Sequence, residues 1–269
     1  MRHAARRWLL SAGAVTAVGV SIMGQGGIAA ASPTAPAVPA TAPAAAAAAA
    51  ASVPAGQVLT VGMHGAAVKA LQKRLSELKY YPGKIDGAFG QNTIEAVWAF
   101  ERVQGFIITA ANANEIGRRM QRALVHPRLP RVLNRHGGSL RIEVNQATEV
   151  LVLYHHNKIE LISHVSTGGG YMYPCPPPGS GTCGPAITPD GSYRAHWFAR
   201  GWLKVPLGMM YNPVFFIGGS YAIHGDIPVS WYPASHGCIR IPMDISQFFH
   251  RLIHVSQTDG TPVYVHGHI

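Results

Sequence analysis

Acidic residues and dense basic runs are both scarce in this chain. Its 269 residues include 12 Asp and Glu against 22 Lys and Arg, which gives a formal net charge of +10. Without a dense Lys/Arg run the sequence argues against a nucleic-acid-binding protein, whereas its basic balance favours acidic polymers as partners. The 14 histidines are scattered and no His-Glu-x-x-His motif occurs, which argues against a zinc enzyme.

A long uninterrupted apolar run is also missing, which limits what the first residues can be. Three arginines precede an apolar stretch at residues 8–23 that Gly13 and Gly19 interrupt, and small residues ending at Ala31 follow. This order is typical of a secretory signal peptide, with retention as a membrane anchor as the weaker alternative. We therefore expect a signal peptide at 1–31 and an extended Ala/Pro-rich linker at 32–56. The mature protein would then lie outside the cytoplasmic membrane, in the periplasmic space or cell wall.

Only three cysteines occur, Cys175, Cys183 and Cys238. In an exported protein an odd number predicts one disulfide and one free thiol. A loop rich in Pro and Gly separates Cys175 from Cys183 and allows them to meet, so we predict a disulfide between these two. Cys238, which lies among histidines, is then the free and reactive thiol. The alternative, three free thiols in a reducing compartment, conflicts with the signal peptide.

Residues 57–127 predict a small domain of three short helices, because apolar residues recur there at helical spacing. The expected inner faces are Val68, Leu71 and Leu75 in the first helix, Ala96, Val97, Phe100 and Val103 in the second, and Ile116, Met120 and Leu124 in the third. Asn92 and Glu95 form a pattern like a capping box at the start of the second helix. A loop rich in turn residues, 80–90, joins the first helix to the second.

This helical stretch resembles the peptidoglycan-binding domain found in many enzymes that act on the cell wall. The matching residues are Gly65, Val68, Leu71-Gln72, Leu75, Gly83, Ile85-Asp86-Gly87, Phe89-Gly90, Thr93, Ala96-Val97, Phe100 and Gly105. The resemblance implies binding to peptidoglycan, and a three-helix spacer that binds nothing is the alternative. Glu101 departs from the family, which usually has glutamine there. Its charge either alters the binding groove or lies on the surface.

From residue 139 onward the spacing of apolar residues changes from that of a helix to that of strands. Strands are predicted at 140–144, 150–154, 158–165, 214–218, 221–224 and 263–265. One helix is expected where Asp244 provides an N-cap for an apolar stripe at 245–252. We therefore predict a linker at 128–138 and a mainly β domain of two packed sheets, a β-sandwich, at 139–267.

One short motif stands out in the predicted β domain. His224-Gly225 is followed by the segment Ser235-His236-Gly237-Cys238-Ile239-Arg240. This pattern resembles the signature of the L,D-transpeptidases, whose catalytic domain is called YkuD-like. The supporting segments are Val165-Ser166-Thr167-Gly168, Thr188-Pro189-x-Gly191 and Gly260-Thr261-Pro262-Val263. The resemblance covers nearly the whole second half of the chain and implies the YkuD-like β-sandwich as its fold.

The motif combines a thiol with imidazoles, as cysteine acyl transfer requires. A thiolate becomes a useful nucleophile when a neighbouring imidazole takes its proton. The resemblance implies that Cys238 is the nucleophile and that His224 accepts and donates the proton. It also implies that the carbonyl of Gly225 orients the imidazole, with Asp226 as the rival orienting group. We expect a thiolate–imidazolium ion pair that lowers the pKa of the thiol.

The other motif residues have less definite roles. His236 either supports the sulfur and the acyl intermediate or locks the loop. Ser235 is expected to form a hydrogen bond within the loop, or else to touch the substrate. The N–H groups of Gly237 and Cys238 are candidate donors to an oxyanion. Arg240 is expected to hold a substrate carboxylate through a two-point fork, and a surface salt bridge is the alternative.

The resemblance implies a two-step acyl transfer on peptidoglycan that uses no cofactor or metal. The thiol attacks the third residue of a stem tetrapeptide, D-alanine leaves, and the thioester passes to an amine of a neighbouring stem, giving a 3→3 cross-link. Water or an amino acid as acceptor would give L,D-carboxypeptidase or exchange activity instead. Acylation by carbapenems is also implied, and we expect a monomer. The competing functions are a cysteine peptidase and a non-catalytic wall-binding protein with an unreactive thiol.

Overall fold

The computed structural model describes residues 57–176 and 180–267. The predicted signal peptide and the predicted Ala/Pro-rich linker both lie outside these residues. Across the described ranges, no helix combines the length and the apolar character that crossing a membrane requires.

The helical domain follows the predicted pattern, and three helices surround an apolar core. The elements are β1 (Leu59–Thr60), α2 (Ala66–Glu77), α3 (Gln91–Gln104), β2 (Glu115–Ile116) and α4 (Arg118–Ala123). Val68, Leu71 and Leu75 of α2 are buried, as their spacing predicts. A short antiparallel ribbon, β1 with β2, completes the domain and was not predicted.

Two details of the predicted helices are wrong. The N-cap of α3 is Gly90, without a capping side chain, and Asn92 instead donates a hydrogen bond to Asp244 Oδ2 at 2.6 Å. Glu95 accepts a hydrogen bond from the N–H of Val229 at 3.2 Å. Ile116 belongs to β2 rather than to the third helix. Local sequence could not show that distant parts of the chain compete for these polar groups.

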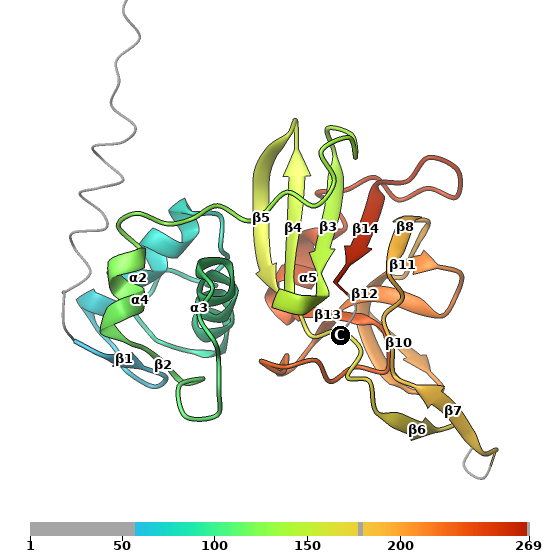
Figure 1. Ribbon diagram of the computed structural model, residues 1–269, viewed down its shortest axis with the longest axis horizontal. Coiled ribbons are helices and arrows are strands. Elements are labelled where there is room, and N and C mark those ends of the chain that lie inside the picture. Colours follow the sequence, from blue (N-terminus) through green and yellow to red (C-terminus); the bar gives the residue numbers. More distant parts are fainter. Residues whose placement is uncertain (1–56, 177–179, 268–269) are drawn as a thin grey trace, which may run out of the picture. The chain divides into compact units, whose positions relative to one another are not determined.

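The β domain contains two five-stranded sheets. The first runs in the order β5 (Lys158–His164), β4 (Val150–His155), β3 (Arg141–Asn145), β14 (Pro262–His266) and β8 (Gly191–Arg194). The second runs β10 (Trp202–Val205), β11 (Gly208–Ile217), β12 (Tyr221–Asp226) and β13 (Ile239–Pro242), with β9 (Trp197–Phe198) beside β11. Figure 1 shows the strands of both sheets in the β domain, which confirms the predicted mainly β architecture.

The main core of the β domain lies between the sheets, and the strand alternation explains it. Ile142 and Val144 of β3 are buried in this core, where they share one apolar cluster with Ile223 of β12 and Ile239 of β13. The alternate residues of β3 face the other side of the sheet. There Arg141 Nε and Glu143 Oε1 form a buried ion pair at 2.6 Å.

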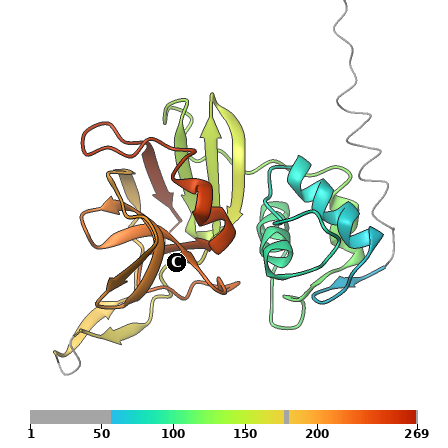
Figure 2. The same ribbon diagram turned by 180° about the vertical axis from the view of Figure 1, so that it is seen from behind.

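One helix and one hairpin complete the β domain. Helix α5 (Met243–Phe249) packs on β11, β12 and β13 and is seen in Figure 2. It begins after Pro242, so Asp244 lies in its first turn and is not the predicted N-cap. The hairpin of β6 (Met172–Pro174) and β7 (Thr182–Pro185) projects from the β domain in Figure 1. The predicted disulfide between Cys175 and Cys183 is present there.

Helix α3 is also packed against the β domain. The apolar cluster that contains Phe100 of α3 also contains Val152 of β4 and Ile162 of β5. The ring of Trp98 on α3 lies edge-on to that of His164 on β5, with 5.2 Å between the ring centres. Because both faces of α3 are covered, every residue from Thr93 to Glu101 is buried. This burial includes Glu101, which we had expected in a groove or on the surface.

Candidate active site

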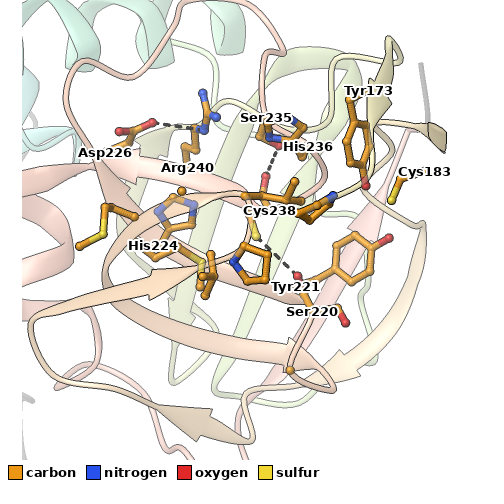
Figure 3. A pocket seen from close by; sticks show the side chains of 18 of the residues that line it. Tyr173, Cys183, Ser220, Tyr221, His224, Asp226, Ser235, His236, Cys238 and Arg240 are labelled. Carbon is orange, nitrogen blue, oxygen red and sulfur yellow. Dashed lines mark hydrogen bonds and ion pairs between the residues drawn. The ribbon is translucent and has the colours of Figure 1, made fainter. Parts of the chain in front are cut away.

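A pocket of about 1080 Å³ opens beside the second sheet, next to the β6–β7 hairpin. Its wall includes five residues of the predicted motif, and Figure 3 shows their side chains. These residues are His224, Ser235, His236, Cys238 and Arg240. Gly225 and Gly237 are not part of the wall. The structure therefore brings the thiol and both imidazoles of the motif to one cavity.

Parallel pairing of β12 with β13 explains why Cys238 and His224 share this wall. His224 pairs with Arg240, and Ile223, one residue earlier, pairs with Ile239. Cys238 directly precedes β13, and because side chains of alternate residues in extended chain face the same side, Cys238 projects from the same face as Arg240. His224 and Asp226 project from the same face of the neighbouring strand, about 4.8 Å away.

The imidazole of His224 is fixed by the backbone, as the family resemblance implied. His224 Nδ1 lies 3.0 Å from the carbonyl oxygen of Gly225. A carbonyl can only accept, so Nδ1 carries the proton and Nε2 has the free lone pair of a base. Burial lowers the pKa of His224, although the hydrogen bond to Gly225 opposes the change. A side chain at position 225 would collide with Ser246 Oγ, so glycine is required there.

The pKa of Cys238 is shifted in the direction opposite to the one that we expected. Burial raises the pKa of Cys238, while a hydrogen bond from the backbone of Ala222 and the charge of Arg240 act in the opposite direction. The Sγ–H group donates to the carbonyl of Ser220, with 3.8 Å between the heavy atoms (Figure 3). Burial therefore disfavours charge on both the thiol and the imidazole.

The loop before Cys238 is closed by its own hydrogen bonds. Ser235 Oγ donates to the carbonyl of Cys238 at 2.5 Å and accepts from the N–H of Gly237 at 2.9 Å. The N–H of Gly237 is therefore engaged and does not serve as the predicted oxyanion donor, which leaves the N–H of Cys238 as the candidate. Gly237 has φ +137°, and a Cβ there would lie 2.6 Å from the Ile187 carbonyl and from the Tyr221 ring.

Arg240 forms an ion pair within the pocket wall. Its Nε lies 3.2 Å from Oδ2 of Asp226, and both side chains are partly exposed. Asp226 therefore binds Arg240, while the Gly225 carbonyl orients His224. The pair keeps a cation and an anion on the same wall as the thiol. Its position is compatible with holding a substrate carboxylate, and that role stays a prediction.

His236 contacts the β6–β7 hairpin. Its ring lies edge-on to those of Tyr173 and Tyr171, at 4.7 and 5.6 Å between ring centres. Burial lowers the pKa of His236, and the charge of Arg240 adds to this effect. These contacts favour the loop-locking role among the two that we considered, because they join the motif to the hairpin that Cys175 and Cys183 close.

Sequence reasoning missed much of the pocket wall. Trp202 of β10, Met209 of β11 and Tyr221 of β12 all line it. Trp202 and Met209 are large apolar side chains that are 55% and 49% exposed, which is unusual enough to indicate a binding surface. The sequence carries no local sign of this exposure, because alternating apolar residues are also what a buried strand shows.

Comparisons with known proteins agree with this geometry. The family model PG_binding_1, a peptidoglycan binding domain, matches residues 64–110, and the model YkuD, an L,D-transpeptidase catalytic domain, matches residues 139–265. The solved L,D-transpeptidase (residues 123–326) from Xylanimonas cellulosilytica is 30% identical over 79% of this chain and 99% of that chain, with a TM-score of 0.68. The L,D-transpeptidase (Yku) from Stackebrandtia nassauensis is 16% identical over 78% of this chain and 97% of that chain, with a TM-score of 0.42. No curated protein matches.

Proposed function

Because the chain belongs to the L,D-transpeptidase family, we propose that it joins peptidoglycan stem peptides by 3→3 cross-links through a thioester on Cys238. The observation that carries this proposal is the shared pocket wall of Cys238 and His224, with His224 Nδ1 bound to the Gly225 carbonyl. This arrangement gives one nucleophile and one base whose free nitrogen is defined. It requires neither a carboxylate partner nor a cofactor.

The first half-reaction acylates the thiol. His224 Nε2 takes the proton of Cys238 as Sγ attacks the carbonyl carbon at the third residue of a stem tetrapeptide. Negative charge develops on the carbonyl oxygen, where the N–H of Cys238 can donate to it. The tetrahedral intermediate collapses when His224 returns the proton to the departing amine. D-alanine leaves, and the third residue is held as a thioester.

The second half-reaction reverses these roles. An amine from a neighbouring stem attacks the thioester carbonyl and gives its proton to His224 Nε2. Collapse of the intermediate releases the cross-linked product, and the sulfur recovers its proton from His224. Water as acceptor would release a tripeptide, and a free amino acid would give an exchanged tetrapeptide. Carbapenems are proposed to acylate the same sulfur, because their strained amide is an acyl donor.

The helical domain indicates where this chemistry takes place. Its match to a peptidoglycan-binding family supports peptidoglycan as the substrate. We propose export across the cytoplasmic membrane to the periplasmic space or cell wall, where that polymer lies, and a monomeric enzyme. The experiment below uses the mature chain, without residues 1–31.

The test is incubation of the protein with purified disaccharide-tetrapeptide, followed by mass spectrometry of protein and products. The wild type should form a thioester adduct, release D-alanine and produce dimers. Cys238→Ala should do none of these, and His224→Gln should form the adduct far more slowly. Gln257→Ala, at an exposed turn position away from the pocket, is the control and should behave as the wild type. Dimer formation by Cys238→Ala would refute the assignment, and tripeptide without dimer would identify a carboxypeptidase instead.

A further inference from the structure

The chain between the two halves of the motif, residues 227–234, is called the connecting loop here. Its backbone is held by side chains from outside the loop. Ser166 Oγ donates to the carbonyl of Tyr232 at 2.8 Å and accepts from the N–H of Ala234 at 3.1 Å. His164 Nε2 donates to the carbonyl of Ser230 at 2.7 Å. Both side chains belong to the β domain: His164 is the last residue of β5, and Ser166 follows two residues later.

Helix α3 of the helical domain supplies two further ties to the connecting loop. Glu95 accepts from the N–H of Val229 at 3.2 Å, and Arg102 Nη2 donates to the carbonyl of Trp231. Glu95 and Arg102 lie two helical turns apart, so both project from one side of α3. Binding to the cell wall does not require these two hydrogen bonds, which hold the backbone between His224 and Cys238.

A second route connects Arg102 to the catalytic loop, defined here as residues 235–238. No hydrogen bond or ion pair joins Arg102 to Glu149 among the described residues, but the positive charge of Arg102 acts to lower the pKa of Glu149. Glu149 is 1% exposed and accepts from both the N–H and the Oγ1–H of Thr167. The carbonyl of Thr167 in turn accepts from the N–H of Ser235 at 2.9 Å. Ser235 Oγ then donates to the carbonyl of Cys238, as Figure 3 shows.

Glu149 combines an unfavourable backbone conformation with a buried side chain. It follows the short 3₁₀ turn Gln146–Thr148 and has φ 48°, in the left-handed region that residues other than Gly, Asn and Asp rarely adopt. A buried carboxylate is also unfavourable unless it is paired and hydrogen-bonded. The two Thr167 donors and, at longer range, the charge of Arg102 reduce that cost. Two unfavourable features at one position are retained because neighbouring groups compensate for them.

We propose that Arg102 and Glu149 are positioning residues, through which helix α3 holds the catalytic loop in the arrangement that makes Cys238 reactive. The helical domain then contributes to the chemistry as well as to binding of the wall. Neither residue touches the substrate or the reacting atoms. The proposal rests on the proposed function only in taking Cys238 as the reacting group.

The positive charge of Arg102 acts on the pKa of Glu149. Burial raises the pKa of Glu149 to about 7, and the bonds from Thr167 and the charge of Arg102 oppose that rise. Removal of Arg102 should therefore raise this pKa further, so that Glu149 is protonated at neutral pH and loses an acceptor for Thr167. Lysine at position 102 would retain the charge but not the two-directional donor geometry of a guanidinium.

The test measures the rate at which iodoacetamide alkylates Cys238 in the mature chain, without residues 1–31, at several pH values. Arg102→Ala should slow alkylation by roughly tenfold to a hundredfold at pH 7, because displacement of the catalytic loop moves Cys238 away from His224, the base that takes its proton. Arg102→Lys should recover part of the loss. Arg122→Ala, an exposed arginine on α4, is the matched control and should react as the wild type. Glu149→Gln should slow the reaction and weaken its pH dependence around neutrality.

Two further measurements separate positioning from general damage to the fold. Thermal unfolding of each variant should show a folded protein at the assay temperature. The Arg102→Ala/Glu149→Gln double variant should lose less than the product of the single losses, because the two residues act in one network. A wild-type rate in Arg102→Ala would overturn the proposal. So would a loss that Arg102→Lys does not relieve at all, or losses that multiply independently.

This result can be told apart from a failure of the proposed function, because iodoacetamide needs no peptidoglycan. If the wild type does not process disaccharide-tetrapeptide but Arg102→Ala still slows alkylation, the positioning role stands and the assigned reaction is wrong. If the wild type is active and Arg102→Ala alkylates normally, the reaction stands and the positioning role is wrong. With an active wild type, Arg102→Ala should lower kcat more than it changes KM for the tetrapeptide, because Arg102 itself does not line the pocket.

Discussion

We expect Glu101→Gln to stabilise the protein at neutral pH. Glu101 is 6% exposed on α3, and its Oε2 has no hydrogen-bond partner among the described residues. Burial raises the pKa of this carboxyl from 4.5 to about 8; the charge of Arg102 opposes the rise and that of Glu115 adds to it. Most of the folded protein therefore carries a protonated Glu101 at pH 7. Glutamine, the residue that the peptidoglycan-binding family usually has there, resembles this protonated form and never ionises.

The sign and size of the effect follow from proton linkage. The folded state keeps a proton that the unfolded chain releases above pH 4.5, so the contribution of Glu101 to stability is complete below that pH. It is lost progressively as the pH rises towards 8. At 1.36 kcal/mol per pKa unit, the free energy of unfolding should fall by about 3 kcal/mol between about pH 5 and about pH 7.5 through this group alone. Glu101→Gln removes that loss.

The measurement is urea unfolding followed by tryptophan fluorescence at several pH values for both proteins. Burial also raises the pKa of Glu95 and Glu149 to about 7 and lowers that of His164 to about 3, but these groups titrate in both proteins. The difference between the two stability curves therefore isolates position 101. Glu160→Gln, an exposed position on β5, is the control and should run parallel to the wild type. Parallel curves for Glu101→Gln as well would show that this carboxylate is ionised in the folded protein.

Three further predictions concern the active site. The Cys175→Ser/Cys183→Ser variant should lose about 2.5 kcal/mol of stability in a urea titration, the chain-entropy estimate for a disulfide that closes a loop this short, and its turnover of tetrapeptide should fall because the β6–β7 hairpin borders the pocket. An unchanged turnover would show that the hairpin does not shape the site. Gly237→Ala should fold, as circular dichroism can check, yet lose most of its activity. The alanine would have to adopt a φ of +137°, and its Cβ would lie 2.6 Å from the Ile187 carbonyl and from the Tyr221 ring. Since burial raises the pKa of Cys238 and lowers that of His224, the alkylation rate should rise with pH beyond neutrality; a plateau already present at acid pH would indicate the thiolate–imidazolium pair instead.

Much of the fold could be predicted because local pattern and tertiary burial agree. Val68, Leu71 and Leu75 lie on one face of a helix by spacing alone, and they are buried. Ile142 and Val144 alternate with charged neighbours and face the core between the sheets. The assignment of Asn92 as a cap failed for the opposite reason, because its side chain bonds to Asp244, which lies 152 positions later in the sequence. A competing partner at that distance leaves no trace in a short window of sequence.

The candidate site shows the same division. The motif predicted which side chains reach the pocket, because strands that pair in parallel place alternate residues on one face. The family resemblance also implied the contact between the Gly225 carbonyl and His224, which the structure contains. The direction in which the pKa of Cys238 shifts could not be predicted in this way, because it depends on how far the surrounding sheet and hairpin bury the thiol. The engagement of the Gly237 N–H by Ser235 likewise depends on the fold of the loop.

The burial that raises the pKa of Cys238 and lowers that of His224 affects which electrophiles the thiol attacks. In a low-dielectric pocket, transferring the proton to His224 creates two charges that water does not solvate, so the ion pair forms at a cost. A bound acyl donor offsets that cost. As the carbon–sulfur bond forms, the negative charge passes from the sulfur to the carbonyl oxygen, which can accept a hydrogen bond from an N–H group. A small soluble alkylating agent offers no such acceptor. The same burial that weakens the thiol towards stray electrophiles therefore preserves its reactivity towards a positioned peptide carbonyl, and the ratio of acylation rate to alkylation rate should exceed that of a free thiol.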